Sequence, residues 1–193
     1  MFASVEEEQL GDVTLLLAAA RQGKTDAVDR LFSLLYQELR SVARRQLRRR
    51  DYGRSLDTTM IVHESYLRLR ERGALKPEDR SQFLAYAASA MRSVIVDLAR
   101  ARLAEKRGGD NVVSLRTNVA ESASASDEEL VRIHEALEEL AAIEPRLAKI
   151  VEMRYFVGMS EQDVADALGI AKRTAQRDWE KARLFLFAAL GVR

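Results

Sequence analysis

The stretch Met159–Arg183, MSEQDVADALGIAKRTAQRDWEKAR, decides the fold of the C-terminal part of the chain and predicts two short helices joined by a tight turn. Ser160 can cap the first helix, and acidic residues follow in the first turn, where the helix dipole favours negative charge. Gly169 stands where this helix must stop, because glycine takes a positive φ without strain. The pattern therefore predicts a helix-turn-helix.

The second helix of this motif is expected from about Lys172 to Phe187. In a helix-turn-helix, the N-terminal end of the second helix enters the major groove of DNA. Here that end carries side chains that can donate to base edges and phosphates: Lys172, Arg173, Thr174, Gln176 and Arg177. The alternative is a plain helical hairpin with a solvated basic face, but the early run of donors and the small residues at the crossing argue against it.

The composition favours a helical protein without a cofactor. Of the 193 residues, 47% are hydrophobic and 32% charged, and two prolines and nine glycines are few for a β-sandwich or barrel. The chain has no cysteine, which excludes disulfides and cysteine-ligated metal sites. No apolar run approaches the roughly 20 residues of a membrane span, and the acidic N-terminal stretch does not resemble a signal peptide. We therefore expect a cytoplasmic protein that does not associate with a membrane.

The net charge of +1 conceals an uneven distribution of charge. Seven arginines and a single aspartate lie between Arg40 and Arg54, whereas the segment Glu121–Glu152 is strongly acidic. Such alternation is typical of a protein that contacts both nucleic acid and a protein partner. No Ser/His/Asp set lies near a candidate pocket, so the sequence does not indicate an enzyme.

Helical periodicity continues through the N-terminal part of the chain. An acidic lead over 1–11 is expected to fray, followed by helices from about Asp12 to Gln22 and from about Ala27 to Arg50. Two more helices are expected over about 57–73 and 82–105. Their caps are expected to be Thr58 or Thr59 for the first and Ser81 for the second.

The helix over 82–105 combines an apolar side with arginines spaced to form a basic stripe, namely Arg92, Arg100, Arg102 and Arg107. Together with Tyr86, this stripe fits phosphate tracking and the stacking of an unpaired base. The alternative is a solvated helix face. His63 and Glu64 invite a metal interpretation, but no second histidine follows one turn later, so we interpret them as part of a polar exposed face.

The segment 108–127 is rich in glycine, serine, asparagine and alanine and is expected to be a flexible linker. The sequence thus predicts an all-α fold with two small helical domains, over 10–107 and 128–193. The second domain is expected to begin with an acidic helix over Glu128–Ile143. A helix from Pro145 to about Tyr155 and the helix-turn-helix should follow.

Three segments in this order carry a resemblance to a known family: IVHESYLRL (61–69), FLAYAASAMRSVIVDLARARLAEKRGG (83–109) and MRYFVGMSEQDVADALGIAKRTAQRDWEKARLFL (153–186). They resemble bacterial RNA polymerase sigma factors of the extracytoplasmic-function (ECF) class. More closely, they are similar to the branch with "VHEAYLRL" and "AKRGG" signatures. The resemblance covers nearly the whole chain.

The resemblance implies that 10–107 form a sigma-2 domain, 128–193 form a sigma-4 domain, and the linker threads the RNA exit channel. It implies binding to the β′ coiled coil and β flap of core RNA polymerase and to the minus-ten and minus-thirty-five promoter elements, by a protein that is a monomer when free. The minus-thirty-five reader would be Lys172, Arg173, Thr174, Gln176 and Arg177. The minus-ten residues would be Tyr86, Arg92, Arg100, Arg102 and Arg107. The helix that docks on β′ would present Asp57, Ile61, Glu64, Tyr66 and Leu67.

The start of the docking helix departs from the family pattern. Sigma factors of this class usually carry several acids there, whereas this chain has Asp57, Thr58, Thr59 and Met60. A phosphothreonine would restore negative charge at a helix N-terminus, where anions are favoured. Because the branch is associated with Ser/Thr kinases in some groups, we hypothesise phosphorylation, with Thr59 favoured over Thr58. The alternative is that these threonines only cap the helix.

Two other functions fit parts of the sequence. A stand-alone helix-turn-helix repressor would dimerise on a palindrome, but the basic N-terminal part offers no obvious dimer seam. A kinase-binding helical adaptor would have lost DNA binding, but the donors over 172–177 argue against this. Neither would bind core polymerase, so co-purification with the core enzyme discriminates between these hypotheses.

Overall fold

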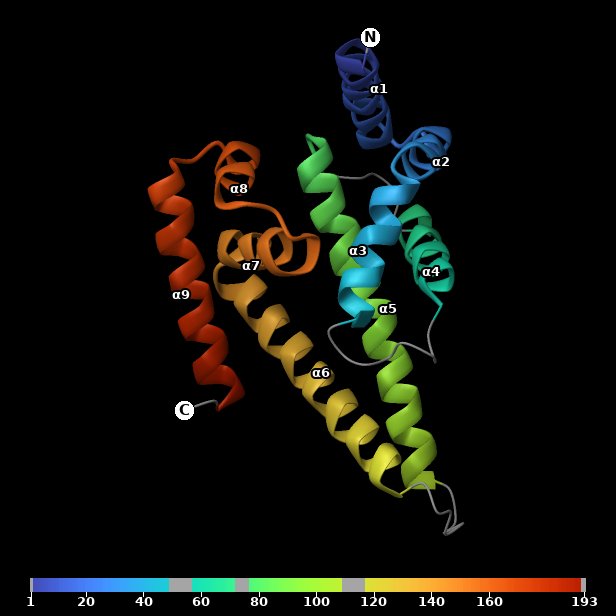
Figure 1. Cartoon of the computed structure of the whole chain (residues 1–193), viewed down its shortest axis with the longest axis vertical. Helices are drawn as coiled ribbons and strands as arrows, with labels where there is room; N and C mark the ends of the chain where they lie inside the picture. The colour runs from blue at the N-terminus through green and yellow to red at the C-terminus, as the bar shows by residue number, and fades with distance from the viewer. Residues whose placement is uncertain (1, 49–56, 72–76, 109–116, 192–193) are drawn as a thin grey trace.

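The computed structural model describes the backbone of residues 2–48, 57–71, 77–108 and 117–191, and the side chains of 12–48, 57–71, 77–105 and 126–191. Within these ranges every regular element is a helix, which confirms the all-α fold class (Figure 1). In chain order the elements are α1 (Phe2–Arg21), α2 (Thr25–Leu34), α3 (Tyr36–Arg48), α4 (Thr58–Glu71), α5 (Arg80–Gly108), α6 (Thr117–Ile143), α7 (Pro145–Val151), the π-helix η1 (Glu152–Val157), α8 (Glu161–Leu168) and α9 (Lys172–Leu190).

Helix α5 is the central element of the fold. It contacts α3 and α4 on one side and α6, η1 and α8 on the other, as Figure 1 shows for the long pair α5 and α6. Phe83, Met91 and Ile95 of α5 are completely or almost completely buried. A helix that is apolar around most of its circumference is expected to be enclosed in this way.

One hydrophobic core runs through both parts of the chain. It joins Leu39 of α3 and Ile95 of α5 to Leu130 and Leu137 of α6. A second, smaller cluster packs Ala85 of α5 against residues of α7, η1, α8 and α9. The segments that the sequence assigns to two domains therefore share their packing in this conformation.

The expected flexible linker is partly helical. Helix α5 extends to Gly108 and α6 begins at Thr117, so the prediction of a non-helical stretch is wrong for 117–127. Alanines recur in this stretch and favour a helix. Near its end, Asp127 is buried and forms an ion pair with Arg102 of α5. The residues 109–116 lie outside the described part of the chain, and the boundaries of the functional domains stay a prediction.

Three other expectations about helix bounds are corrected. The single helix expected from Ala27 to Arg50 is broken at Leu35, which is buried between α2 and α3 and lets both helices turn their apolar sides inward. The lead over 1–11 is helical from Phe2 onward, consistent with its glutamates, glutamine and leucine, which favour helices. The helix that starts at Pro145 changes to a π-helix at Glu152.

Aspartates cap the two helices for which hydroxyl caps were expected. The backbone N–H of Thr59 donates to Asp57 Oδ1 (3.0 Å), so Asp57 is the cap of α4 and the threonines occupy its first turn. The backbone N–H of Gln82 likewise donates to Asp79 Oδ1 (2.8 Å), in place of the expected Ser81 cap. A carboxylate satisfies the free N–H groups and also matches the helix dipole.

Among the described residues, no helix combines the length and the apolar character that a membrane span requires.

Candidate functional site

The helix-turn-helix is closed by reciprocal hydrogen bonds at the start of α8. The backbone N–H of Asp163 donates to Ser160 Oγ (3.1 Å), and the backbone N–H of Ser160 donates to Asp163 Oδ2 (2.9 Å). Hydrogen bonds from the Ser160 side chain and backbone lower the pKa of the Asp163 carboxyl. Gly169 then ends α8 with a φ of 62°. Both the Ser160 cap and the glycine stop are therefore confirmed.

The N-terminal half of α9 presents most of its expected donors to solvent. Lys172, Arg173, Gln176 and Arg177 are exposed, and Thr174 is half-buried. All of these except Lys172 border a hollow of about 670 Å³, which is lined by Ala171, Arg173, Thr174, Gln176, Arg177 and Glu180. The amide of Gln176 donates to Glu161 Oε2 of α8 (2.6 Å), so this side chain ties the two helices together.

Buried contacts fix the orientation of α9. Asp178 is only 1% exposed and forms an ion pair with Arg146 of α7 (2.8 Å). Neither Asp178 oxygen gains a hydrogen bond of good geometry from the described residues, so the ion pair is its main electrostatic support. On the next position of α9, Trp179 lies beneath the guanidinium of Arg154, 5.4 Å from the ring centre. These contacts hold the exposed donors in a fixed direction.

Helix α4 is held by its neighbours through one face. Ile61, Val62, Ser65 and Leu69 are buried, whereas Leu67 and Met60 are exposed. Ile61, which the resemblance places at the docking surface, therefore lies in the core and positions the helix. The exposed Asp57 and half-buried Glu64 border the outer face.

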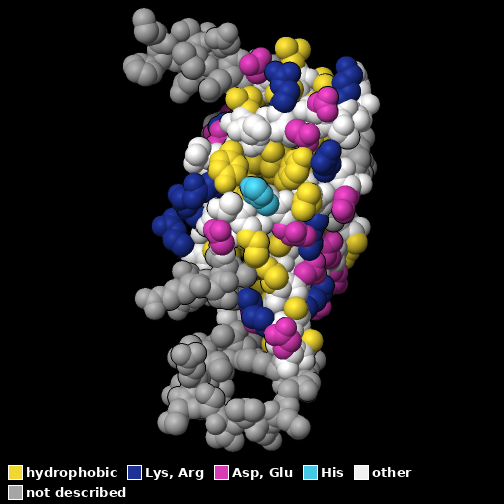
Figure 2. Space-filling view, turned by 90° about the vertical axis from the view of Figure 1, so that its right-hand side faces the viewer, with side chains coloured by type: hydrophobic (Ala, Val, Ile, Leu, Met, Phe, Trp, Pro, Cys, Tyr) yellow, Lys and Arg dark blue, Asp and Glu magenta, His cyan; other side chains and the backbone are white. Residues whose placement is uncertain are grey.

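A hollow of about 280 Å³ lies between α2 and α4, and His63 and Tyr66 line it together with Phe32 and Tyr36. Figure 2 shows this face, on which a histidine is surrounded by hydrophobic side chains. The hydroxyl of Tyr66 donates to Asp29 Oδ1 (2.7 Å), and this hydrogen bond raises the pKa of the phenol.

The arginines of α5 face acidic residues of the C-terminal part of the chain. Arg102 forms two hydrogen bonds with the buried Asp127 (2.8 and 3.0 Å). Arg100 is half-exposed and pairs with Glu135 of α6 (3.3 Å). The side chain of Arg107 lies outside the described residues. The arginines therefore do not form an open basic stripe in this conformation.

Arg92 is the most deeply buried of these arginines and is only 3% exposed. Its guanidinium donates to Glu152 Oε1 of η1 through two nitrogens (2.7 and 3.1 Å). It also contacts Glu138 (3.3 Å) and Nδ1 of His134 on α6, and lies over the ring of Phe156. Burial raises the pKa of Glu152, and burial together with the charge of Arg92 lowers the pKa of His134.

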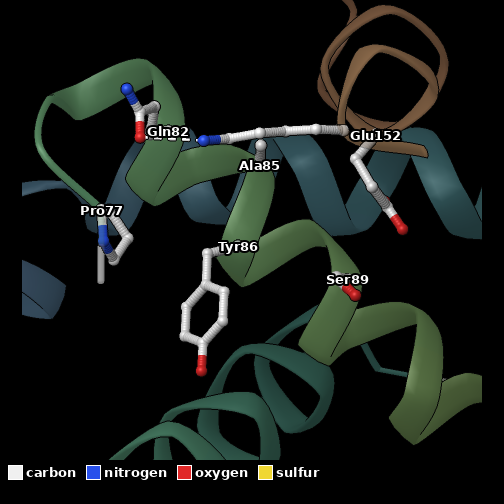
Figure 3. A pocket seen from close by; sticks show the side chains of 7 residues that line it. Pro77, Gln82, Ala85, Tyr86, Ser89 and Glu152 are labelled. Carbon is white, nitrogen blue, oxygen red and sulfur yellow. Dashed lines mark hydrogen bonds between the residues drawn. The ribbon is translucent and has the colours of Figure 1, made fainter. Parts of the chain in front are cut away.

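Tyr86 lines a separate hollow of about 210 Å³ between the two parts of the chain. Figure 3 shows that Pro77, Gln82 and Ser89 border it from α5 and the preceding turn, whereas Glu152 approaches from η1. Lys149 of α7 also lines the hollow and donates to Gln82 Oε1 (2.9 Å). The expected base-stacking residue thus borders a hollow that residues of the C-terminal part of the chain also line in this conformation.

Comparison with known proteins decides the family. A family model described as ECF sigma factor matches residues 10–192. The chain belongs to the ECF sigma factor family. No curated protein and no solved structure matches the chain.

As an ECF sigma factor, the protein acts in transcription initiation and binds core RNA polymerase and promoter DNA. The match favours this function over the repressor and adaptor hypotheses. The roles of individual residues in the sigma factor stay predictions, as does the branch with its kinase.

The sequence did not indicate the acidic partners of α5. Glu152, Glu138 and His134 form a cluster around Arg92, although they lie 42 to 60 positions away along the chain. The available signal was the contrast between an arginine-rich helix and the acidic segment that follows it. That contrast predicts attraction between two parts of one molecule as readily as binding to two external partners.

Proposed function

We propose that this sigma factor reads the minus-thirty-five element with the N-terminal half of α9 and docks on the β′ coiled coil through α4. The observation that carries the proposal is the set of exposed donors on α9, held in direction by the buried Asp178. The β flap is the expected partner of the same C-terminal part. The protein would act in the cytoplasm, where core polymerase works.

Substitution in α9 tests the reader. Arg173→Ala and Arg177→Ala should each remove a base or phosphate donor, and a base-reading contact contributes about 1–3 kcal/mol of discrimination. Promoter-specific transcription in vitro should fall, whereas co-purification with core polymerase should persist. Arg183→Ala is the matched control, because Arg183 lies further along α9 and stacks over Phe187. Unchanged transcription by both reader variants would exclude this role.

The exposed Leu67 and the acidic Asp57 and Glu64 of α4 support the docking assignment. On α5, we assign Tyr86, Arg100 and Arg102 to the minus-ten element, with Arg92 and Arg107 as further members of the set. The guanidinium group of arginine forms bidentate hydrogen bonds with phosphate, as it does with carboxylate here. The present carboxylate partners of the arginines therefore occupy donors that DNA phosphates would use.

We also infer that phosphorylation of a threonine on α4 strengthens polymerase docking. The first turn of α4, which is described in full, contains no acidic residue. Thr58 and Thr59 are half-buried in that turn, where a phosphate would meet free N–H groups and the positive end of the dipole. Asp57 already accepts the N–H of Thr59, so a phosphate on Thr59 would compete with this cap.

Affinity for core polymerase tests the threonine proposal. Binding should be weak for unmodified protein, stronger after phosphorylation, and unresponsive to the kinase in Thr59→Ala. Replacing Thr58 and Thr59 together by acids should strengthen binding without a kinase. The gain should shrink with added salt, since surface charges are screened over about 10 Å at 0.1 M. If the unmodified protein binds core polymerase tightly, and neither phosphorylation nor acidic substitution changes the affinity, Thr58 and Thr59 have only a structural role in the first turn of α4.

A further inference from the structure

A hydrogen bond between α8 and α9 sets the orientation of the Gln176 amide. Gln176 is exposed among the donors of α9, and its Nε2 lies 2.6 Å from Oε2 of Glu161, at the start of α8. Figure 1 shows α8 beside the N-terminal end of α9. A carboxylate accepts hydrogen bonds and donates none, so the nitrogen end of the amide, and not the oxygen end, faces Glu161.

Glu161 is itself held in place by a second donor. Its Oε1 lies 3.5 Å from a guanidinium nitrogen of Arg154 on η1, and this guanidinium lies over the ring of Trp179, 5.4 Å from the ring centre. The side chains of Glu161 and Arg154 are only 30% and 23% exposed. Each oxygen of Glu161 therefore has its own donor, and moving the carboxylate away from α9 would break both contacts.

The oxygen end of the amide remains for DNA. Within the described part of the chain, the side chain of Gln176 makes only the hydrogen bond to Glu161, and it borders the hollow that Arg173 and Arg177 also line. In the major groove, adenine and cytosine present an amino group that donates, whereas guanine and thymine present a carbonyl oxygen that accepts. An amide oxygen attracts the amino group and repels the carbonyl oxygen.

We propose that Glu161 is a positioning residue for promoter selectivity, which holds Gln176 so that its amide oxygen reads the amino group of an adenine or a cytosine. The inference rests on the proposed function of α9 as the minus-thirty-five reader and deepens it by naming the chemical group that one side chain recognises. A glutamine whose amide turns freely presents either end and distinguishes the two groups poorly. This part of the selectivity therefore depends on a residue outside the recognition helix.

Base analogues test which group is read. A promoter library randomised through the minus-thirty-five element, selected by full-length protein with core polymerase, locates the base pair whose preference disappears in Gln176→Ala. At that pair, one duplex lacks the exocyclic amino group and a matched duplex lacks the carbonyl group opposite it. Both analogues lose the same Watson–Crick hydrogen bond, so the difference between them reports the contact with the protein.

Loss of the amino group should weaken binding of this complex by about fivefold more than loss of the carbonyl group, as expected for one hydrogen bond. Equal binding to the two analogue duplexes, or weaker binding to the duplex that lacks the carbonyl group, would overturn the proposal.

Glu161→Gln tests the positioning role with almost no change in shape. A glutamine at this position donates as well as accepts, so the amide of Gln176 can take either orientation. The fivefold difference should shrink to about twofold or less, while selection at other base pairs and binding to core polymerase persist. Asp166→Asn is the matched control, because Asp166 is an exposed carboxylate of α8 that accepts from the amide of Gln162 (2.8 Å). An unchanged difference in Glu161→Gln, or an equal loss at every base pair, would overturn the proposal.

Exchanging the two residues should restore the selectivity. Glu161→Gln combined with Gln176→Glu places the donor on α8 and a carboxylate on α9, without changing the charge of the pair. Because a carboxylate presents only oxygen, the preference for the amino group should return, with cytosine favoured, since glutamate accepts from its amino group. A double variant that stays as unselective as Glu161→Gln would contradict the inference.

The same library separates this inference from the proposed function. If Arg173→Ala and Arg177→Ala change the selected minus-thirty-five sequence but Gln176→Ala changes no base pair, the role of Glu161 and Gln176 is refuted and the reader assignment stands. If none of the three variants changes the selected sequence, the reader assignment itself fails.

Discussion

Removal of the Arg146 side chain should destabilise the helix-turn-helix more than neutralisation of its partner Asp178. The reason is the unequal burial of the pair: the Asp178 side chain is 1% exposed, whereas that of Arg146 is 54% exposed. Among the described residues, Arg146→Ala leaves the buried Asp178 carboxylate with Arg177, 3.9 Å away, as its one remaining cation. Asp178→Asn leaves an arginine that water can solvate.

The magnitudes follow from this asymmetry. Deleting one partner of a fully buried pair lowers the free energy of unfolding by about 3–5 kcal/mol. Because water reaches Arg146, we expect Arg146→Ala to lower the free energy of unfolding by about 2–3 kcal/mol, less than for a fully buried pair. We expect about 1 kcal/mol for Asp178→Asn, which loses a charge-assisted contact but creates no buried charge. The double variant should lose less free energy of unfolding than the two single variants added together, because Asp178→Asn removes the buried charge that Arg146→Ala leaves unpaired.

Urea unfolding measures these differences. Trp179 is the single tryptophan and lies next to Asp178, so its fluorescence reports on α9, while circular dichroism reports on all helices. Lys181→Ala, an exposed change on α9, should stay within about 0.5 kcal/mol of the natural protein. Equal effects of the two single changes, or effects that simply add, would refute the argument from burial.

Three further predictions concern the cap, the salt dependence and the pH response. Ser160→Ala should lower the free energy of unfolding by about 1 kcal/mol; because the capping bonds lower the pKa of the partner carboxyl, this loss should shrink in urea titrations as the pH falls below its ordinary value of 3.8. Arg100→Gln combined with Arg102→Gln should reduce the slope of log DNA affinity against log salt by about 1.8, at about 0.9 for each phosphate contact; an unchanged slope would show that these arginines only pair with carboxylates of the chain itself. Burial and the charge of Arg92 lower the pKa of His134, so the unfolded chain binds a proton at this site more readily than the folded protein, and the free energy of unfolding should fall as the pH drops below 6.5, the ordinary value of histidine. His134→Gln should remove this part of the pH dependence in urea titrations, and an unchanged loss of stability below pH 6.5 in the variant would contradict the assignment to His134.

Local signals in the sequence predicted the helix-turn-helix well. Ser160, Gly169 and Pro145 act through the backbone of their own neighbourhood, so their effect does not depend on the rest of the fold. The same local reasoning chose the wrong caps for α4 and α5, because an aspartate one or two positions earlier was also available. The break at Leu35 was not predictable from periodicity, since α2 and α3 each keep their apolar side inward across it.

The basic stripe on α5 shows where sequence reasoning reaches its limit. An arginine on a helix face has the same spacing whether it meets solvent, DNA phosphate or a carboxylate of its own chain. Arg92 was expected at the surface, yet it is enclosed by Glu152 and His134, which approach from η1 and α6. Only the three-dimensional arrangement brings these groups together, and it does so at the surface where promoter DNA is proposed to bind. Because carboxylate and phosphate compete for the same guanidinium fork, the charge pattern that suits the protein to DNA also allows its own acidic helix to take the place of DNA.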